Sequence, residues 1–230
     1  MNRQAVNPYL PSWEYIPDGE PHVFNGRVYV YGSHDRFNAP IFCVNDYVCW
    51  SAPVEDLSEW RYEGVIYRKK QDPKNPLGYH LLFAPDVCQG PDGRYYLYYA
   101  FDFLGIMSVA VCDTPAGEYK FLGHIHYADG TLWGRRRGDQ LPFDPGVLLD
   151  DDGRVWLYSG FYNAVPAILT GGHKLRCDGG TVLELEKDMV TIKTEPRVIF
   201  PKKGPGAFQG HEFFEASSIR KEGKLSLIHI

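Results

Sequence analysis

The hydrophobic positions of this chain follow the short rhythm of β-strands. No long stretch keeps the i, i+3, i+4, i+7 apolar spacing of an amphipathic helix, and Gly and Pro interrupt the chain often. Three segments, 26–32, 93–100 and 153–160, instead open with Gly-Arg and continue with β-branched and aromatic residues. Glycine supplies the positive φ of a tight hairpin, and the run after it is typical of a strand. The pattern therefore predicts an all-β protein.

A carboxylate stands at a similar distance before each of these turns. Four acids lie seven to nine residues ahead of the glycines at 26, 93, 153 and 223: Asp18, Asp86, Asp144 and Glu215. A short apolar segment between acid and turn, such as 146–149, indicates the first strand of a repeated unit. Repeated four-stranded sheets predict a β-propeller, because such sheets bury their faces by stacking around an axis. The four acids are then expected at one end of a central channel.

Composition and charge narrow the range of functions. The chain has 230 residues, 44% of them hydrophobic, and a net charge of −5, which argues against coating nucleic acid or an anionic membrane. Residues 1–15 lack the apolar stretch of a signal peptide, and no later segment has the length of a membrane span. We therefore expect residues 1–230 to be the N-terminal portion of a single β-propeller catalytic domain, in a soluble, cytoplasmic protein with a small or neutral partner.

The five cysteines are odd in number, widely spaced and without a CxxC pair. This usage argues against both a disulfide framework and a zinc site. We expect buried free thiols.

Carboxylates gathered in one pocket have a specific chemical consequence. They cannot all ionise at low cost, so at least one should have a raised pKa and keep its proton near neutral pH, as a general acid does. A better solvated neighbour can then take a proton from water. Inverting glycoside hydrolysis needs such a pair, about 6.5–9.5 Å apart with water between them.

Four stretches carry a more specific resemblance: 7–35, 83–100, 143–160 and 211–221. Together they are similar to family 43 glycoside hydrolases, inverting five-bladed propellers typified by β-xylosidases and α-L-arabinofuranosidases. The resemblance implies that Asp18 is the general base and Glu215 the general acid, with Glu212 as the rival for the second role. It also implies that Asp86 is a third acid, which orients the general acid and tunes its pKa. The expected partner is an oligosaccharide containing xylose or arabinose.

Further residues are candidates for contact with the sugar. Asp144 resembles a substrate-side aspartate of the family, and His34 and Asp35 follow the first outward strand, where they either line the pocket or form a structural pair. His211 is a candidate channel residue. The candidate stacking faces are Trp13, Phe37, Phe101 and Trp133. Some family members carry a channel calcium, but no local ligand set indicates one here, so we predict neither metal nor cofactor.

The end of the chain departs from the family pattern. After residues 223–224 the sequence reads LSLIHI in place of a tyrosine-rich strand. We therefore expect an incomplete ring of about three and a half blades, with weak stability or activity. Three alternatives stay open: a retaining fructosidase, a glycoside phosphorylase on a related propeller, and a propeller that binds glycans without chemistry. Sequence leaves the sugar, the linkage and the oligomeric state undetermined.

Overall fold

The computed structural model describes residues 7–205 and 209–229. Within these ranges the regular structure consists of fourteen strands and one short 3-10 helix, η1 (Lys69–Gln71). The all-β prediction is confirmed. The described residues contain no helix that could span a bilayer.

The strands form antiparallel sheets in chain order. Sheet 1 consists of β1 (Glu20–Phe24), β2 (Arg27–Tyr31), β3 (Tyr47–Pro53) and β4 (Arg61–Tyr67). Sheet 2 consists of β5 (Asp86–Gln89), β6 (Tyr95–Ala100), β7 (Met107–Cys112) and β8 (Lys120–His124). Sheet 3 consists of β9 (Gly146–Leu149), β10 (Val155–Phe161), β11 (Gly179–Leu185) and β12 (Arg197–Pro201). Sheet 4 is the hairpin of β13 (Ser218–Glu222) and β14 (Leu225–His229).

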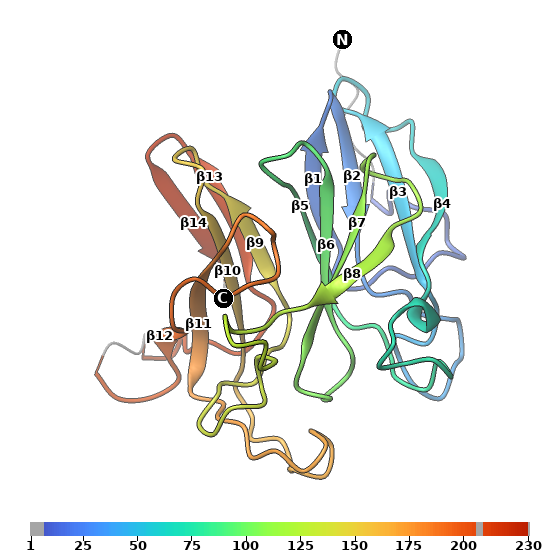
Figure 1. The fold of residues 1–230 in the computed structure, drawn as a ribbon. Coiled ribbons are helices and arrows are strands. Elements are labelled where there is room, and N and C mark those ends of the chain that lie inside the picture. The colour runs from blue at the N-terminus through green and yellow to red at the C-terminus, as the bar shows by residue number, and fades with distance from the viewer. Residues whose placement is uncertain (1–6, 206–208, 230) are drawn as a thin grey trace.

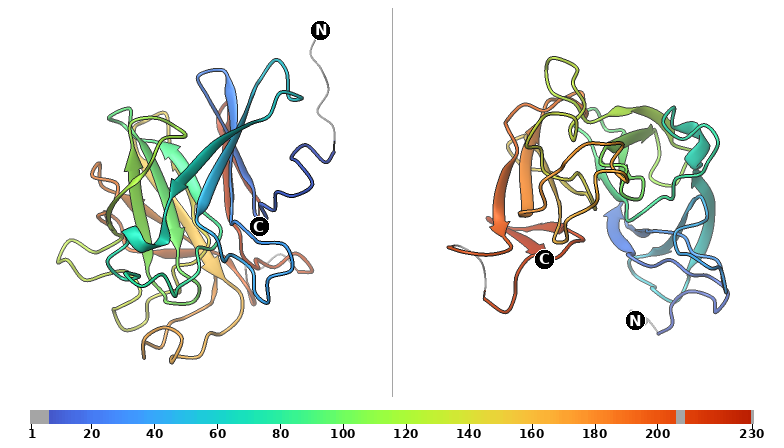
Figure 2. Two further views of the ribbon diagram at one scale, coloured as in Figure 1. Left: turned by 90° about the vertical axis from the view of Figure 1, so that its right-hand side faces the viewer. Right: turned by 90° about the horizontal axis from the view of Figure 1, so that it is seen from below.

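The four sheets follow one another around a common axis (Figures 1 and 2). The first strand of each sheet lies innermost, and β9 contacts both β5 and β13. Segments that precede the first strands therefore meet at one end of the axis, although tens of residues separate them in the sequence.

Strand β6 explains why the sheets stack. All six of its residues, YYLYYA, are buried. Because side chains alternate between the faces of a strand, Tyr95, Leu97 and Tyr99 pack against sheet 1, whereas Tyr96 and Tyr98 pack against sheet 3. A strand with two apolar faces has to lie between two other sheets, as β6 does.

A buried network of hydrogen-bonded side chains also links sheets 1 and 2. The Tyr67 and Tyr99 hydroxyls lie 2.6 Å apart, and the Tyr99 hydroxyl donates to Asp72 at 2.7 Å. His124 Nε2 lies 3.0 Å from the other oxygen of Asp72, whose side chain is fully buried. Every side chain of this network has a hydrogen-bond partner, as buried polar groups require.

All five cysteines are free, which confirms the prediction of unpaired thiols. Cys112 is half-buried and the other four are buried.

Candidate active site

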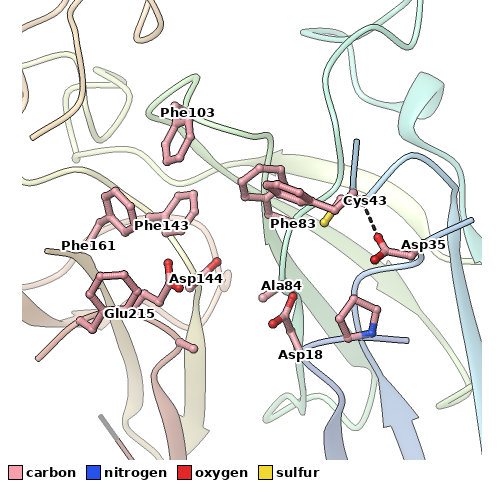
Figure 3. A pocket seen from close by; sticks show the side chains of 14 residues that line it. Asp18, Asp35, Cys43, Phe83, Ala84, Phe103, Phe143, Asp144, Phe161 and Glu215 are labelled. Carbon is pink, nitrogen blue, oxygen red and sulfur yellow. Dashed lines mark hydrogen bonds between the residues drawn. The ribbon is translucent and has the colours of Figure 1, made fainter. Parts of the chain in front are cut away.

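A cavity of about 410 Å³ opens at the end of the axis where the first strands begin. Asp18 precedes β1 by two residues, Asp144 precedes β9 by two, and Glu215 precedes β13 by three. All three line the cavity, and Figure 3 shows Asp144 and Glu215 together, facing Asp18. Three of the four acids that the repeat pattern singled out therefore meet in one place.

Strand register explains why the fourth acid does not join them. Glu20 pairs with Tyr31, Asp86 with Tyr98 and Gly146 with Tyr158, so these three first-strand residues occupy equivalent positions. Two residues earlier stand Asp18, Ala84 and Asp144. Sheet 2 thus presents Ala84 to the cavity, and Asp86 lies roughly 7 Å further along the strand.

The expectation that Asp86 shares the pocket of Asp18 and Glu215 needs this correction. Asp86 is not among the residues that line the cavity, and its side chain is 1% exposed. One carboxylate oxygen lies 2.6 Å from His22 Nε2, and the other accepts from the backbone amide of Val147 at 2.7 Å. The Asp86 side chain therefore bonds to the neighbouring first strands β1 and β9 and does not face the cavity.

The backbone at the cavity mouth is unusual. Asp18 has a φ of 56°, Asp144 of 45° and Ala216, next to Glu215, of 57°. The left-handed region is unfavourable for these residue types, mildly for Asp and more for Ala. Backbone conformation of this kind clusters at functional sites, where the surrounding structure maintains it.

Sheets 3 and 4 approach each other closely beside these residues. A Cβ at Gly146 would lie 2.5 Å from the carbonyl oxygen of Ser217, so only glycine fits there. The segments that carry Asp144 and Glu215 are therefore in direct backbone contact.

The three acids of the cavity differ in how deeply they are buried. Burial raises the pKa of Asp144 well above its usual range, and the charges of Glu215 and Asp18 add to the effect. Burial, and then the charge of Asp18, also raises the pKa of Glu215. Asp18 is exposed and accepts a hydrogen bond from the Ser33 hydroxyl at 2.8 Å. Asp144 and Glu215 thus hold their protons more strongly than exposed carboxyls do, and they lie opposite Asp18, which is open to solvent.

Phenylalanine is the commonest residue type in the cavity wall, with six of the fourteen lining residues. Phe143 contacts Phe161 with ring centroids 4.8 Å apart and stacks on Phe103 at 5.3 Å. The remaining phenylalanines of this wall are Phe42, Phe83 and Phe214. This apolar surface is the source of the burial that raises the pKa of the two acids.

The predicted stacking residues lie elsewhere. Phe101 and Trp133 are fully buried in the core. Trp13 and Phe37 are exposed but do not line the cavity, and they contact Trp50 and Tyr15 respectively. Sequence reasoning missed the phenylalanine wall, although a signal was present: Phe83, Phe143 and Phe214 each stand directly before a cavity residue, namely Ala84, Asp144 and Glu215.

Of the other polar residues predicted for the site, one lines the cavity and the rest lie outside it. Asp35 lines the cavity and accepts a hydrogen bond from the Cys43 amide (Figure 3). His34 does not line it, because its ring is held by Glu14 at 3.0 Å and by the carbonyl of Asp46 at 2.8 Å. His211 and Glu212 are exposed outside the cavity, so Glu215 is the acid that the fold presents to it.

One group among the described residues brings three potential metal-ligating atoms within 4.8 Å of one another: Glu20, His22 and Asp86. Calcium prefers six to eight oxygen ligands. Here both oxygens of Asp86 already accept hydrogen bonds, and Glu20 is paired with the Arg220 guanidinium. The group therefore does not fit a calcium ion, and no chemistry is assigned to one.

Comparison with known proteins identifies the family. The model of glycosyl hydrolases family 43 matches residues 17–225. The chain belongs to this family.

Named relatives of this family 43 chain include two xylosidase/arabinosidases. The protein of Thermoclostridium stercorarium is 60% identical over 227 residues, which cover 97% of this chain and 46% of the relative. Xylosidase/arabinosidase 43A of Humicola insolens is 31% identical, with 90% of this chain and 69% of the relative covered. The chain thus spans about half the length of the first of these relatives.

Solved structures agree on the fold. A family 43 β-xylosidase/α-arabinofuranosidase from a compost metagenome, in complex with xylotriose and in a calcium-free form, is 26% identical. The match has a TM-score of 0.70 and covers 98% of this chain and 72% of that one. A family 43 enzyme from Xanthomonas citri, 23% identical, matches with a TM-score of 0.68 over 94% of this chain and 66% of its own.

Proposed function

We propose that this chain carries the catalytic acids of an inverting glycosidase that removes xylose or arabinose from oligosaccharides. The observation that carries the proposal is the cavity in which Asp18 faces Asp144 and Glu215, two acids with raised pKa. The names of the relatives, xylosidase/arabinosidase, support the sugar class. Family membership supports a five-bladed propeller for the complete enzyme, with a xylo- or arabino-oligosaccharide as its substrate.

Glu215 is the proposed general acid. Its raised pKa lets it hold its proton to a higher pH than an exposed Glu does, and its position on the cavity wall lets it donate that proton to the departing sugar oxygen. Asp18 is the proposed general base, because it faces Glu215 across the cavity and is open to solvent, from which the attacking water comes.

Asp144, in place of Asp86, is the proposed third acid. It is 6% exposed and lies beside Glu215, whose charge adds to the effect of burial in raising the pKa of Asp144. A protonated Asp144 can donate a hydrogen bond inside the cavity without adding charge there. Asp35, on the opposite wall, remains a candidate to bind sugar hydroxyls.

The anomer of the first product tests the mechanism. The complete enzyme is mixed with nitrophenyl β-xyloside or nitrophenyl α-L-arabinofuranoside, and proton NMR follows the sugar as it is released. Inversion gives the opposite anomer first, before mutarotation equilibrates the sample. Release of the same anomer would indicate a retaining enzyme, a strict need for phosphate would indicate a phosphorylase, and binding without release would indicate a glycan-binding protein. Cytoplasmic location stays a prediction.

A further inference from the structure

Asp86 links two first strands, β1 and β9, that belong to different sheets. Its carboxylate lies 2.6 Å from His22 Nε2 on β1, and it accepts from the Val147 amide on β9 at 2.7 Å. Since Asp86 belongs to β5, a single side chain ties three inner strands together. The oxygen that faces His22 also accepts from the Val87 amide at 2.7 Å, and at 1% exposure of the side chain the other oxygen would lose its hydrogen bond without Val147.

Glu20 continues the connection to the fourth inner strand. It accepts from the Ser218 hydroxyl at 2.9 Å and pairs with the Arg220 guanidinium, both on β13. Arg220 also donates to the carbonyl of Pro21 at 2.7 Å. Glu20 and His22 lie two residues apart on one face of β1, so the two links begin side by side. The inner ends of all four sheets are thereby connected.

Residues of this connection follow the cavity acids within two or three positions along the chain. Asp18 stands two residues before Glu20, and Asp144 stands three before Val147. The positions of Asp18 and Asp144 therefore depend on β1 and β9, which Asp86 of sheet 2 holds together. Ala84, which replaces an acid at the equivalent position of sheet 2, contributes no carboxylate of its own.

We infer that Asp86 and His22 are positioning residues, which fix the spacing of Asp18 from Asp144 and Glu215 by bridging β1, β5 and β9. The inference rests on the proposed function. An attacking water needs a base and an acid at a defined separation, and a displacement of about 1 Å in such a geometry costs on the order of 10²-fold in rate. Neither Asp86 nor His22 lines the cavity, so loss of the bridge should act on kcat and leave KM nearly unchanged.

Three variants of the complete enzyme test the inference. His22→Ala removes the link to β1, His22→Gln keeps a side-chain donor in that place, and Asp86→Ala removes both links. Asp92→Asn is the matched control, because Asp92 is an exposed acid in the β5–β6 loop that bonds only within that loop and to Tyr96. Steady-state kinetics on nitrophenyl β-xyloside give kcat and KM, and circular dichroism confirms folding before each assay.

We expect His22→Ala to lower kcat by about 10- to 100-fold with KM within about twofold, and His22→Gln to recover most of that loss. Asp86→Ala, where it folds, should lose at least as much as His22→Ala, and Asp92→Asn should match wild type. Folded His22→Ala protein with wild-type kcat would overturn the inference, and so would a loss confined to KM. Failure of the proposed function has a different signature, since it shows in the wild-type enzyme itself, as no release of sugar, as release of the retained anomer or as a strict need for phosphate.

Discussion

Asp18 and Asp144 occupy equivalent positions in sheets 1 and 3, two residues before the first strand, and both have left-handed backbone, with φ of 56° and 45°. Asn tolerates this conformation well, whereas Ala is strained in it. Substitution by Asn therefore removes the acid while it preserves the backbone, and it is the cleaner probe of both residues.

The first prediction concerns the proposed acid and base. Asp18→Asn and Glu215→Gln should each lower kcat by about 10²- to 10⁴-fold, because each removes a group that transfers a proton in the reaction. Initial rates on nitrophenyl β-xyloside measure the effect. Asp152→Asn, in the exposed β9–β10 loop, serves as control and should keep full activity. Half of the wild-type kcat in either variant would remove that residue from its assigned role.

The second prediction concerns Asp144 and stability. Its pKa in the folded state is raised, so its contribution to stability is fully present below the unfolded value, about 3.9, and is lost as pH rises through the folded value. Asp144→Asn carries no charge at any pH. The variant should therefore unfold at a higher temperature than wild type at pH 8 and at nearly the same temperature at pH 4, with impaired catalysis throughout. Thermal melts at both pH values measure this; an equal Tm at pH 8 would contradict it.

The third prediction concerns the apolar surface beside the general acid. Phe214 lines the cavity next to Glu215 and is 49% exposed, so its truncation should admit water with little loss of stability. Because burial is the main cause of the raised pKa of Glu215, Phe214→Ala should lower that pKa. The alkaline limb of the kcat/KM profile would then move to lower pH. Phe37→Ala, at an exposed ring outside the cavity, should leave the profile in place.

The fourth prediction concerns Asp72, between sheets 1 and 2. Burial opposes its ionisation, yet hydrogen bonds from His124, Lys74 and Tyr99 and the charge of His124 lower its pKa. The stability that it contributes is present above the unfolded value, about 3.9, and is lost as pH falls through the folded value. Asp72→Asn should cost about 1–3 kcal/mol of unfolding free energy at pH 7 and less at low pH. Denaturant titrations at pH 7 and pH 3.5 compare the two proteins; a constant difference would count against the assignment.

The fifth prediction concerns thiol reactivity. Burial raises the pKa of Cys43 to about 12, and the thiolate is the reactive form. Cys112 is the more accessible thiol. Iodoacetamide at pH 8 should therefore modify Cys112 first in the folded protein, and Cys43 only after unfolding, as peptide mass spectrometry would show. Cys112→Ser should abolish the early adduct; equal labelling of both thiols would disagree with the buried position of Cys43.

The fold was predictable because its signals are local and repeated. The Gly-Arg turn and the aromatic run after it mark β2, β6 and β10, and all three lie second in their sheets. The apolar segment at 146–149 coincides with β9. Strands that bury both faces, like β6, give the long apolar runs by which they are recognised.

The site was predictable only to within a few residues, because the hairpins differ in length. Two residues, 25–26, separate the paired ends of β1 and β2, whereas five, 90–94, separate those of β5 and β6. Counting back from the turn glycine therefore does not keep register between sheets. In sheet 2 the count reaches Asp86, two positions past the cavity, and only strand pairing identifies Ala84 as the counterpart of Asp18.

The stacking residues were missed for a different reason. Sequence shows that an aromatic residue is present, but the direction of its side chain depends on which sheet packs over it. Phe101 and Trp133 are covered in this way, while Phe143 and Phe161 face the cavity floor.

The tight fit at Gly146 makes the active site asymmetric. Since the carbonyl of Ser217 leaves no room for even a methyl group there, the segments that carry Asp144 and Glu215 lie in direct backbone contact. Asp18 stands on sheet 1, whose polar links to sheets 3 and 4 run through Asp86 and Glu20. Sugars of different size or linkage should therefore be distinguished mainly by residues on the side of sheet 1, and changes of specificity should accumulate there.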